Sequence, residues 1–178
     1  GFLLMMNFAT IGIIIDWSPV WLTKDLGAPL FLGGLVIMFF NGGEIIARVS
    51  GSNLINKYGE IVIGCYFSII ACIILFISIF TMNLYIILSG IIIFGFGTAN
   101  FIAIVLRQAI SETNETISLT ISNLLTLGFG GFIFGPVMVG YLAEFMGLTF
   151  NMYLLSFIWA FNGLALYYLI NKNSLKNN

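Results

Sequence analysis

The sequence predicts an all-α membrane protein built as a six-transmembrane-helix bundle, and two observations support this fold class. Of the 178 residues, 60% are hydrophobic and 7% are charged, whereas soluble domains carry about 25% charged residues. The apolar residues also form continuous runs of about 20 residues, the length that a helix needs to cross a bilayer core. Runs of this length, without alternation of apolar and polar residues, favour helices over the strands of a transmembrane barrel.

Polar turns divide the apolar sequence into six segments. The first turn covers 23–27, the second covers 55–60, and the longest polar connection, 108–115, precedes the fifth segment. Each segment is long enough to satisfy its backbone as a membrane-spanning helix. The sequence therefore predicts a single domain, 1–178, with spans at about 2–22, 29–54, 61–80, 84–107, 116–145 and 151–170.

Basic residues predict the orientation of the bundle, because short cytoplasmic loops carry an excess of Lys and Arg. Leaving aside Arg48, which lies well within a span, Lys24 alone falls on one side. The side shared by both termini carries four basic residues, which are Lys57, Arg107, Lys172 and Lys176. We therefore expect a multi-pass protein of the cell (inner or plasma) membrane with both termini in the cytoplasm.

Charge and residue counts argue against several functional classes. A net charge of −1 without a basic cluster gives no reason to expect nucleic-acid binding. The chain has no His, and its two cysteines, Cys65 and Cys72, would lie about 10 Å apart on one helix, too far for a disulfide. Because the ligands and nucleophiles of metal, haem and Cys/His chemistry are almost absent, we expect no metal, no cofactor and no enzymatic activity.

Asp16 is an acidic residue inside the first predicted span, directly before Trp17 and the Ser18-Pro19 pair. A carboxylate near the middle of a span costs about 2.5 to 3.5 kcal/mol on insertion scales. Two interpretations stay open. Asp16 either carries protons or binds substrate, or it is a helix-end acid that reaches the outer headgroups or caps a neighbour.

Glu44 and Arg48 in the second span are spaced as i and i+4, and Asn41 lies on the same helical face. Neither ion would tolerate hydrocarbon alone, so the spacing predicts that they pair inside the protein. The pair could act as a gate or a coupling site whose pairing changes with conformation. It could equally be a static ion pair that neutralises both charges.

The remaining polar residues are distributed unevenly over the spans. Asn100 in the fourth span and Asn123 in the fifth recur with other polar or small residues at helical spacing. This pattern predicts a polar interior shared by spans one, two, four and five. Spans three and six carry few polar residues, Asn162 among them, and are interpreted as lipid-facing or peripheral.

Glycines concentrate in the fifth span. Small residues let helix backbones approach closely in lipid, and a proline permits a bend. We therefore interpret this span as a packing and flexing surface rather than a ligand site, formed by Gly128, Gly131, Gly135, Pro136 and Gly140.

The turn after the second span resembles the signature of the major facilitator superfamily, Gly-x-x-x-Asp-(Arg/Lys)-x-Gly-(Arg/Lys)-(Arg/Lys). In the aligned run 52–61, Lys57 and Gly59 match this pattern, while Ser52 and Asn56 are softened substitutes. Glu60 reverses the expected charge. The family carries this motif between the second and third helices of a six-helix half, the position at which it occurs here.

Three further stretches resemble helices of bacterial sugar-permease-like members of that superfamily. Residues 16–22 are similar to the seventh helix, 95–100 to the tenth, and 128–136 with 140–144 to the eleventh. The fourth span also lacks the basic residue that the family's fourth helix usually carries. The resemblance therefore implies the C-terminal half of such a transporter, helices seven to twelve.

The resemblance implies alternating access, in which two six-helix bundles rock around a central site. We expect half of a secondary active transporter for a small polar solute, coupled to protons, embedded in the lipid bilayer and completed by the missing N-terminal half or a second copy. A non-transporting membrane scaffold or a degenerate transporter fragment is the alternative, supported by the altered loop motif. The expected substrate or proton pathway comprises Asp16, Trp17, Asn41, Glu44, Arg48, Asn100 and Asn123.

Overall fold

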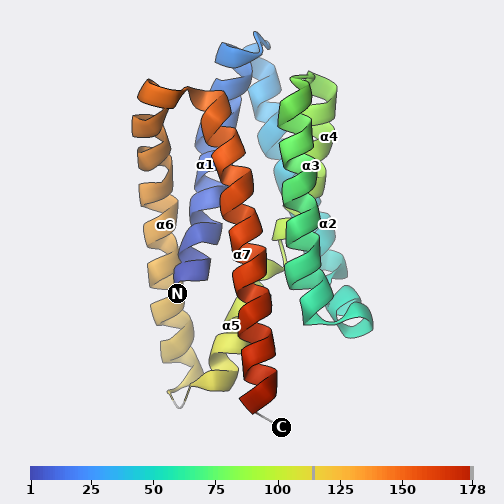
Figure 1. The fold of residues 1–178 in the computed structure, drawn as a ribbon, viewed down its shortest axis with the longest axis vertical. Coiled ribbons are helices and arrows are strands. Elements are labelled where there is room, and N and C mark those ends of the chain that lie inside the picture. Colours follow the sequence, from blue (N-terminus) through green and yellow to red (C-terminus); the bar gives the residue numbers. More distant parts are fainter. Residues whose placement is uncertain (114, 177–178) are drawn as a thin grey trace.

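The chain folds into a bundle of long helices that run alternately up and down (Figure 1). The computed structural model describes residues 1–113 and 115–176, with side chains described to residue 173. Within these residues every regular element is a helix, which confirms the predicted all-α, six-helix fold class. The elements are α1 (Phe2–Asp25), α2 (Leu30–Tyr58), η1 (Ile61–Tyr66), α3 (Phe67–Thr81), α4 (Leu84–Thr98), α5 (Phe101–Glu112), α6 (Ile117–Met146) and α7 (Leu148–Lys176).

Six helical segments are long and apolar enough to cross a membrane, and each of the predicted spans coincides with one of them. Several helices run further than the apolar residues do. For example, α2 continues to Tyr58 and α5 to Glu112, because helical hydrogen bonding extends into the polar residues that flank each apolar run. The third segment starts with the π-helical turn η1, and the fourth divides into α4 and α5.

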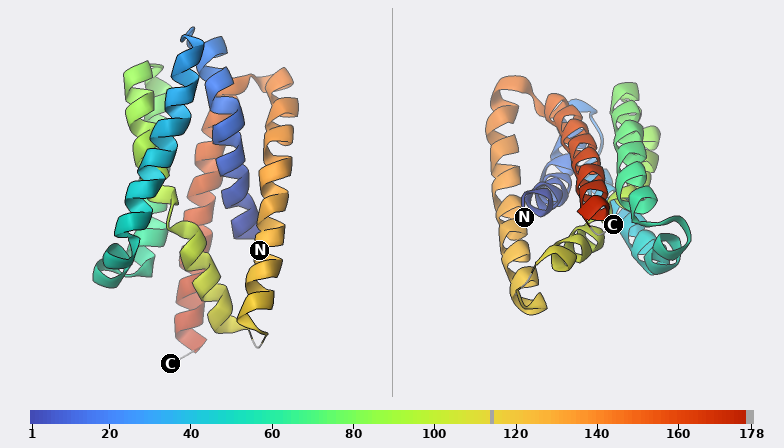
Figure 2. Two further views of the ribbon diagram at one scale, coloured as in Figure 1. Left: turned by 180° about the vertical axis from the view of Figure 1, so that it is seen from behind. Right: turned by 60° about the horizontal axis from the view of Figure 1, so that its bottom comes forward.

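Helices distant in sequence form the main packing contacts. α1 packs along α6, and α2 packs along α4 (Figures 1 and 2). α3 lies against α4 and α7, while α7 also contacts α1. An aromatic cluster joins three of these elements: the Trp159 ring of α7 lies 6.0 Å from Phe94 of α4 and 5.0 Å from Phe101 of α5, measured between ring centroids.

Burial within the chain differs from the predicted division into interior and lipid-facing spans. α6 is the least buried of the six segments, although the sequence assigned it to the polar interior. α7, expected to be peripheral, buries Asn162 completely. The difference arises because burial depends on which helices pack against each other, and a polarity count along one helix does not contain that information.

Glycines allow α2 and α4 to approach closely. A methyl group at Gly43 would collide with the Ile92 carbonyl oxygen of α4, and one at Gly95 would collide with the Phe40 carbonyl oxygen of α2. Backbone therefore meets backbone at two points along this pair. Such contact is a common means of helix association in membranes, where hydrophobicity no longer drives packing.

We predict that Gly43→Ala destabilises the protein by about 1–3 kcal/mol, because the added methyl group forces α2 away from α4. The adjacent Gly42→Ala is the matched control, since the space over Gly42 is open. Alanine there should stabilise the helix by up to about 1 kcal/mol. Unfolding of both purified variants in detergent measures the difference, and equal stabilities would contradict the close contact.

Candidate functional site

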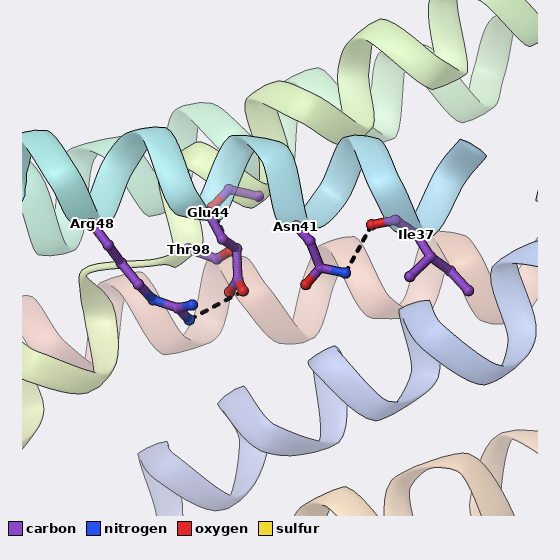
Figure 3. A network of polar contacts seen from close by, with 6 residues as sticks. Ile37, Asn41, Glu44, Arg48 and Thr98 are labelled. Carbon is purple, nitrogen blue, oxygen red and sulfur yellow. Dashed lines mark hydrogen bonds and ion pairs between the residues drawn. The ribbon is translucent and has the colours of Figure 1, made fainter. Parts of the chain in front are cut away.

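Glu44 is a buried carboxylate on the inner face of α2. It is 4% exposed, and its Oε2 lies 3.1 Å from Nη2 of Arg48, whose side chain is half exposed. The predicted ion pair is therefore present in the structure, with one ion inside the bundle and the other at its surface (Figure 3). Asn41 lies on the same helix, but its Nδ2 donates to the Ile37 carbonyl oxygen at 2.9 Å.

The close contact between α2 and α4 accounts for the burial of Glu44. Gly43, Glu44 and Ala47 all belong to the buried face of α2. Thr98 of α4, drawn in the same view, donates its hydroxyl to the Gly95 carbonyl oxygen at 3.1 Å (Figure 3). Because a buried carboxylate is costly without a partner, Arg48 one turn further along α2 is the residue that stabilises it.

Asn100 lies at the break between α4 and α5. Its Nδ2 donates to the Ala47 carbonyl oxygen of α2 at 3.1 Å, and a methyl group at Gly51 would collide with its Oδ1. The amide thus joins the break to α2. Asn100 is also the N-cap residue of α5, where its carbonyl oxygen accepts a hydrogen bond from the Ile104 N–H at 3.2 Å.

A groove opens beside this break, because α5 turns away from α2 toward α6 (Figure 2). Its volume is about 500 Å³. Arg48 and Asn100 supply its principal polar groups. The full lining consists of Arg48, Gly51, Ser52, Ile55, Ala99, Asn100, Ile102, Ala103 and Leu106.

Asp16 and Trp17 occupy a different hollow, between α1 and α6. Asp16 is exposed and lines this hollow together with Trp17 and Pro136. The Trp17 Nε1 donates to the Pro136 carbonyl oxygen at 2.8 Å, so the indole joins α1 to α6. Pro19 packs against Gly33, and counting from this contact at 1.5 Å per residue places Asp16 about 12 Å from Glu44 along the bundle.

The remaining predicted pathway residue, Asn123, is exposed on α6. It lies on neither of the two hollows. Of the predicted residues, the structure therefore brings Arg48 and Asn100 together at one groove, with Glu44 directly behind Arg48. Among the described residues, no three His, Cys, Asp or Glu side chains gather in a group that could hold a metal ion.

The α6 glycines face α1. A methyl group would meet Phe8 from Gly128, the Met5 carbonyl oxygen from Gly131, and Trp17 from Gly140. Gly135 similarly abuts Ala9, and Pro136 accepts the Trp17 hydrogen bond. The α1 and α6 backbones approach each other at Gly131 and Gly135, while Gly128 and Gly140 make room for aromatic side chains of α1.

The motif-like turn caps α2. Gly59 has a φ of 85°, a conformation that favours glycine, and its N–H donates to the Ile55 carbonyl oxygen at 2.8 Å. The side chains of Ser52, Asn56 and Lys57 are exposed. The backbone conformation at the end of α2 therefore explains the glycine at this position, without reference to any function.

A polar network at the same end of the bundle was missed by the sequence reasoning. Arg107, expected to be a loop charge, lies with Nη1 3.0 Å from Oε1 of Glu60. The Gln108 Nε2 donates to Glu60 at 2.6 Å, and Asn173 of α7 donates to Gln108 at 3.1 Å. The signal available in sequence was the opposite charges at adjoining ends of the third and fourth spans.

Asp25 forms a second unpredicted link, at the opposite end of the bundle. Its Oδ2 accepts hydrogen bonds from the Thr149 backbone N–H at 3.0 Å and the Thr149 hydroxyl at 2.6 Å. Trp21 donates to that hydroxyl at 2.8 Å. The end of α1 therefore caps the start of α7, where a carboxylate is electrostatically favourable.

Comparison with known proteins identifies relatives over most of the chain, although no family model matches it. An uncharacterized MFS-type transporter of Yersinia pestis is 26% identical over 149 residues, which are 84% of this chain and 39% of that protein. Membrane protein MosC of Rhizobium meliloti is 25% identical over 148 residues, 83% of this chain and 36% of that protein. An uncharacterized transporter of Sinorhizobium fredii is 21% identical over 133 residues, 75% of this chain and 35% of that protein.

The chain is a homologue of MFS-type transporters. Its six apolar helices fit one half of the major facilitator superfamily fold, which confirms the resemblance drawn from the sequence. The chain spans less than two fifths of the length of these curated relatives. Two of these relatives are named as transporters, and the six apolar helices are those of a multi-pass membrane protein.

Two asparagines offer a matched test of the buried polar groups in this bundle. We predict that Asn100→Leu destabilises the protein by about 1 kcal/mol, because the hydrogen bond to Ala47 is lost. Asn162 is buried without a hydrogen-bond partner in the described part of the chain, so Asn162→Leu should stabilise it by about 1 kcal/mol. Unfolding in detergent measures the stability of both variants. Equal changes in the free energy of unfolding would contradict the assignment of a hydrogen bond to Asn100 and none to Asn162.

Proposed function

We propose that this chain is half of a secondary active transporter that moves a small polar solute by alternating access, coupled to protons. The observation that carries the proposal is the match of most of the chain to proteins named as transporters, over less than two fifths of their length. In alternating access, two bundles rock about a site between them. A six-helix half therefore requires a second bundle to complete the pathway.

The exposed surface of the bundle is consistent with a missing partner. α6 exposes large apolar side chains on several faces, among them Phe129, Val137 and Met138. One face can contact lipid, while another can contact a second bundle. We propose that the second bundle is the N-terminal six-helix half or a second copy of this chain, and that both termini of this chain lie in the cytoplasm.

Two carboxylates are candidates for proton coupling. Asp16 is exposed beside Trp17 between α1 and α6, and Glu44 is buried beside Arg48 on α2. Ionisable residues inside membrane spans commonly mark substrate or proton pathways. We propose that Asp16 exchanges protons with the hollow between α1 and α6. The Glu44–Arg48 ion pair breaks and re-forms as the transporter changes conformation.

We predict that a single copy of this chain does not catalyse uptake. Proteoliposomes diluted to one chain per vesicle should show no accumulation of labelled sugars or organic acids above empty vesicles. Vesicles that also contain the complementary six-helix half, or two copies of the chain, should accumulate solute. Net uptake by single chains would contradict the half-transporter proposal.

We also predict that Asp16→Asn in the complete transporter lowers uptake driven by a pH gradient by about a hundredfold, the lower end of the range for loss of a proton-transfer group. Glu115→Gln, a matched change in the exposed connection before α6, should leave uptake unchanged. Accumulation and pH dependence equal to wild type in the Asp16 variant would remove this residue from the coupling role.

A further inference from the structure

We propose that the groove between α2 and α5 binds a small organic monocarboxylate at Arg48, and that a proton transfers to Glu44 when the anion binds. This inference rests on the proposed transport function and specifies its substrate class. It follows from the shape of the groove, the geometry of Arg48 and the charge balance of the buried pair.

The shape of the groove fits a small solute with a carbon body. Its volume of about 500 Å³ lies within the range of small-molecule sites. Ile55, Ile102 and Leu106 give it an apolar wall, and Asn100 fixes the adjoining helix break to α2. One charged group among apolar side chains is suited to a ligand with one charged end.

Arg48 presents donors that the ion pair leaves available. A guanidinium carries five N–H groups in a planar fork, which matches a carboxylate in a bidentate arrangement. Nη2 of Arg48 contacts Glu44 at 3.1 Å, while the side chain as a whole is half exposed and lines the groove. A carboxylate entering the groove can therefore replace Glu44 as the partner of Arg48.

Charge balance requires a proton to accompany the anion. Glu44 and Arg48 together are neutral, so an added monoanion leaves one uncompensated negative charge within an apolar segment, which is costly. A proton on Glu44 restores neutrality: the Glu44–Arg48 ion pair breaks, Glu44 becomes a neutral acid, and Arg48 pairs with the solute carboxylate. One proton thus binds with each anion.

No other ionisable group lines this groove within the described residues. The elements packed against α2 are α1, α4 and η1. Asp16 of α1 lies about 12 Å from Glu44 along the bundle, and the polar residues Thr98 and Asn100 lie at the end of α4 and the start of α5. The other ionisable side chains on these elements and on α2 itself are Lys24, Asp25, Lys57, Tyr58, Cys65, Tyr66 and Tyr85, with Glu60 before η1 paired to Arg107.

The test measures binding of labelled lactate, pyruvate and gluconate to the complete reconstituted transporter as a function of pH. Lactamide and glucose serve as uncharged probes. In the wild type we expect the affinity for at least one anion to depend on pH. Over the pH range in which free Glu44 is ionised, the affinity should rise about tenfold for each unit by which the pH is lowered, as one coupled proton requires. The uncharged probes should show no pH dependence.

Four variants separate the roles. Glu44→Gln mimics the protonated acid and should bind the anion independently of pH, at least as tightly as the wild type. Arg48→Gln should lose anion binding, whereas Arg48→Lys should retain weaker, pH-dependent binding. Lys24→Gln, which removes an exposed cation at the end of α1, should behave as wild type.

The outcomes also separate this inference from the transport proposal. If none of the three anions binds with pH dependence, or if Glu44→Gln keeps the wild-type pH dependence, the monocarboxylate site is wrong. Uptake of an uncharged solute without any anion binding would retain the transport proposal and overturn this inference. Anion binding with the expected pH dependence but without uptake of any solute would support the monocarboxylate site and contradict the transport proposal. If Arg48→Gln does not fold, the pH dependence of anion affinity in Glu44→Gln still tests the inference.

Discussion

The burial of Glu44 is the constraint on which the α2 side of the structure depends. A carboxylate that is 4% exposed in an apolar bundle needs a compensating charge, and Arg48 supplies it one helical turn away. The glycine contacts between α2 and α4 bring the two backbones together and hold the carboxylate inside. The positive charge then reaches the surface through the longer arginine side chain, where α5 diverges and the groove opens.

The same physical requirement explains the rest of the bundle. Inside a membrane, polar groups must find partners within the protein, and helices associate through close packing and hydrogen bonds. Trp17 donates a hydrogen bond to the Pro136 carbonyl oxygen of α6, beside glycines that allow α1 to pack closely against α6. At the two ends of the bundle, Asp25 caps α7 and Glu60 holds Arg107 and Gln108. These links join α1 to α6 and α7, and the residue before η1 to α5.

Local sequence patterns predicted much of this structure. Six apolar runs separated by polar turns specify six helices, and the i,i+4 spacing of Glu44 and Arg48 specifies their pairing, because both depend on geometry within one segment. The family resemblance also came from short local stretches. In contrast, the bond from Asn100 to Ala47 and the burial of Asn162 depend on how separate helices rotate and pack. No periodicity within a single helix determines that relation.

A double-mutant cycle on Glu44 and Arg48 tests the central claim most directly, that Arg48 stabilises the buried Glu44 carboxylate. The free energy of unfolding would be measured in detergent for wild type, Glu44→Gln, Arg48→Gln and the double variant. An ion pair with one buried partner predicts a coupling free energy of about 1–3 kcal/mol, within the range found for residues in contact. A value near zero, as many exposed ion pairs give, would contradict the account.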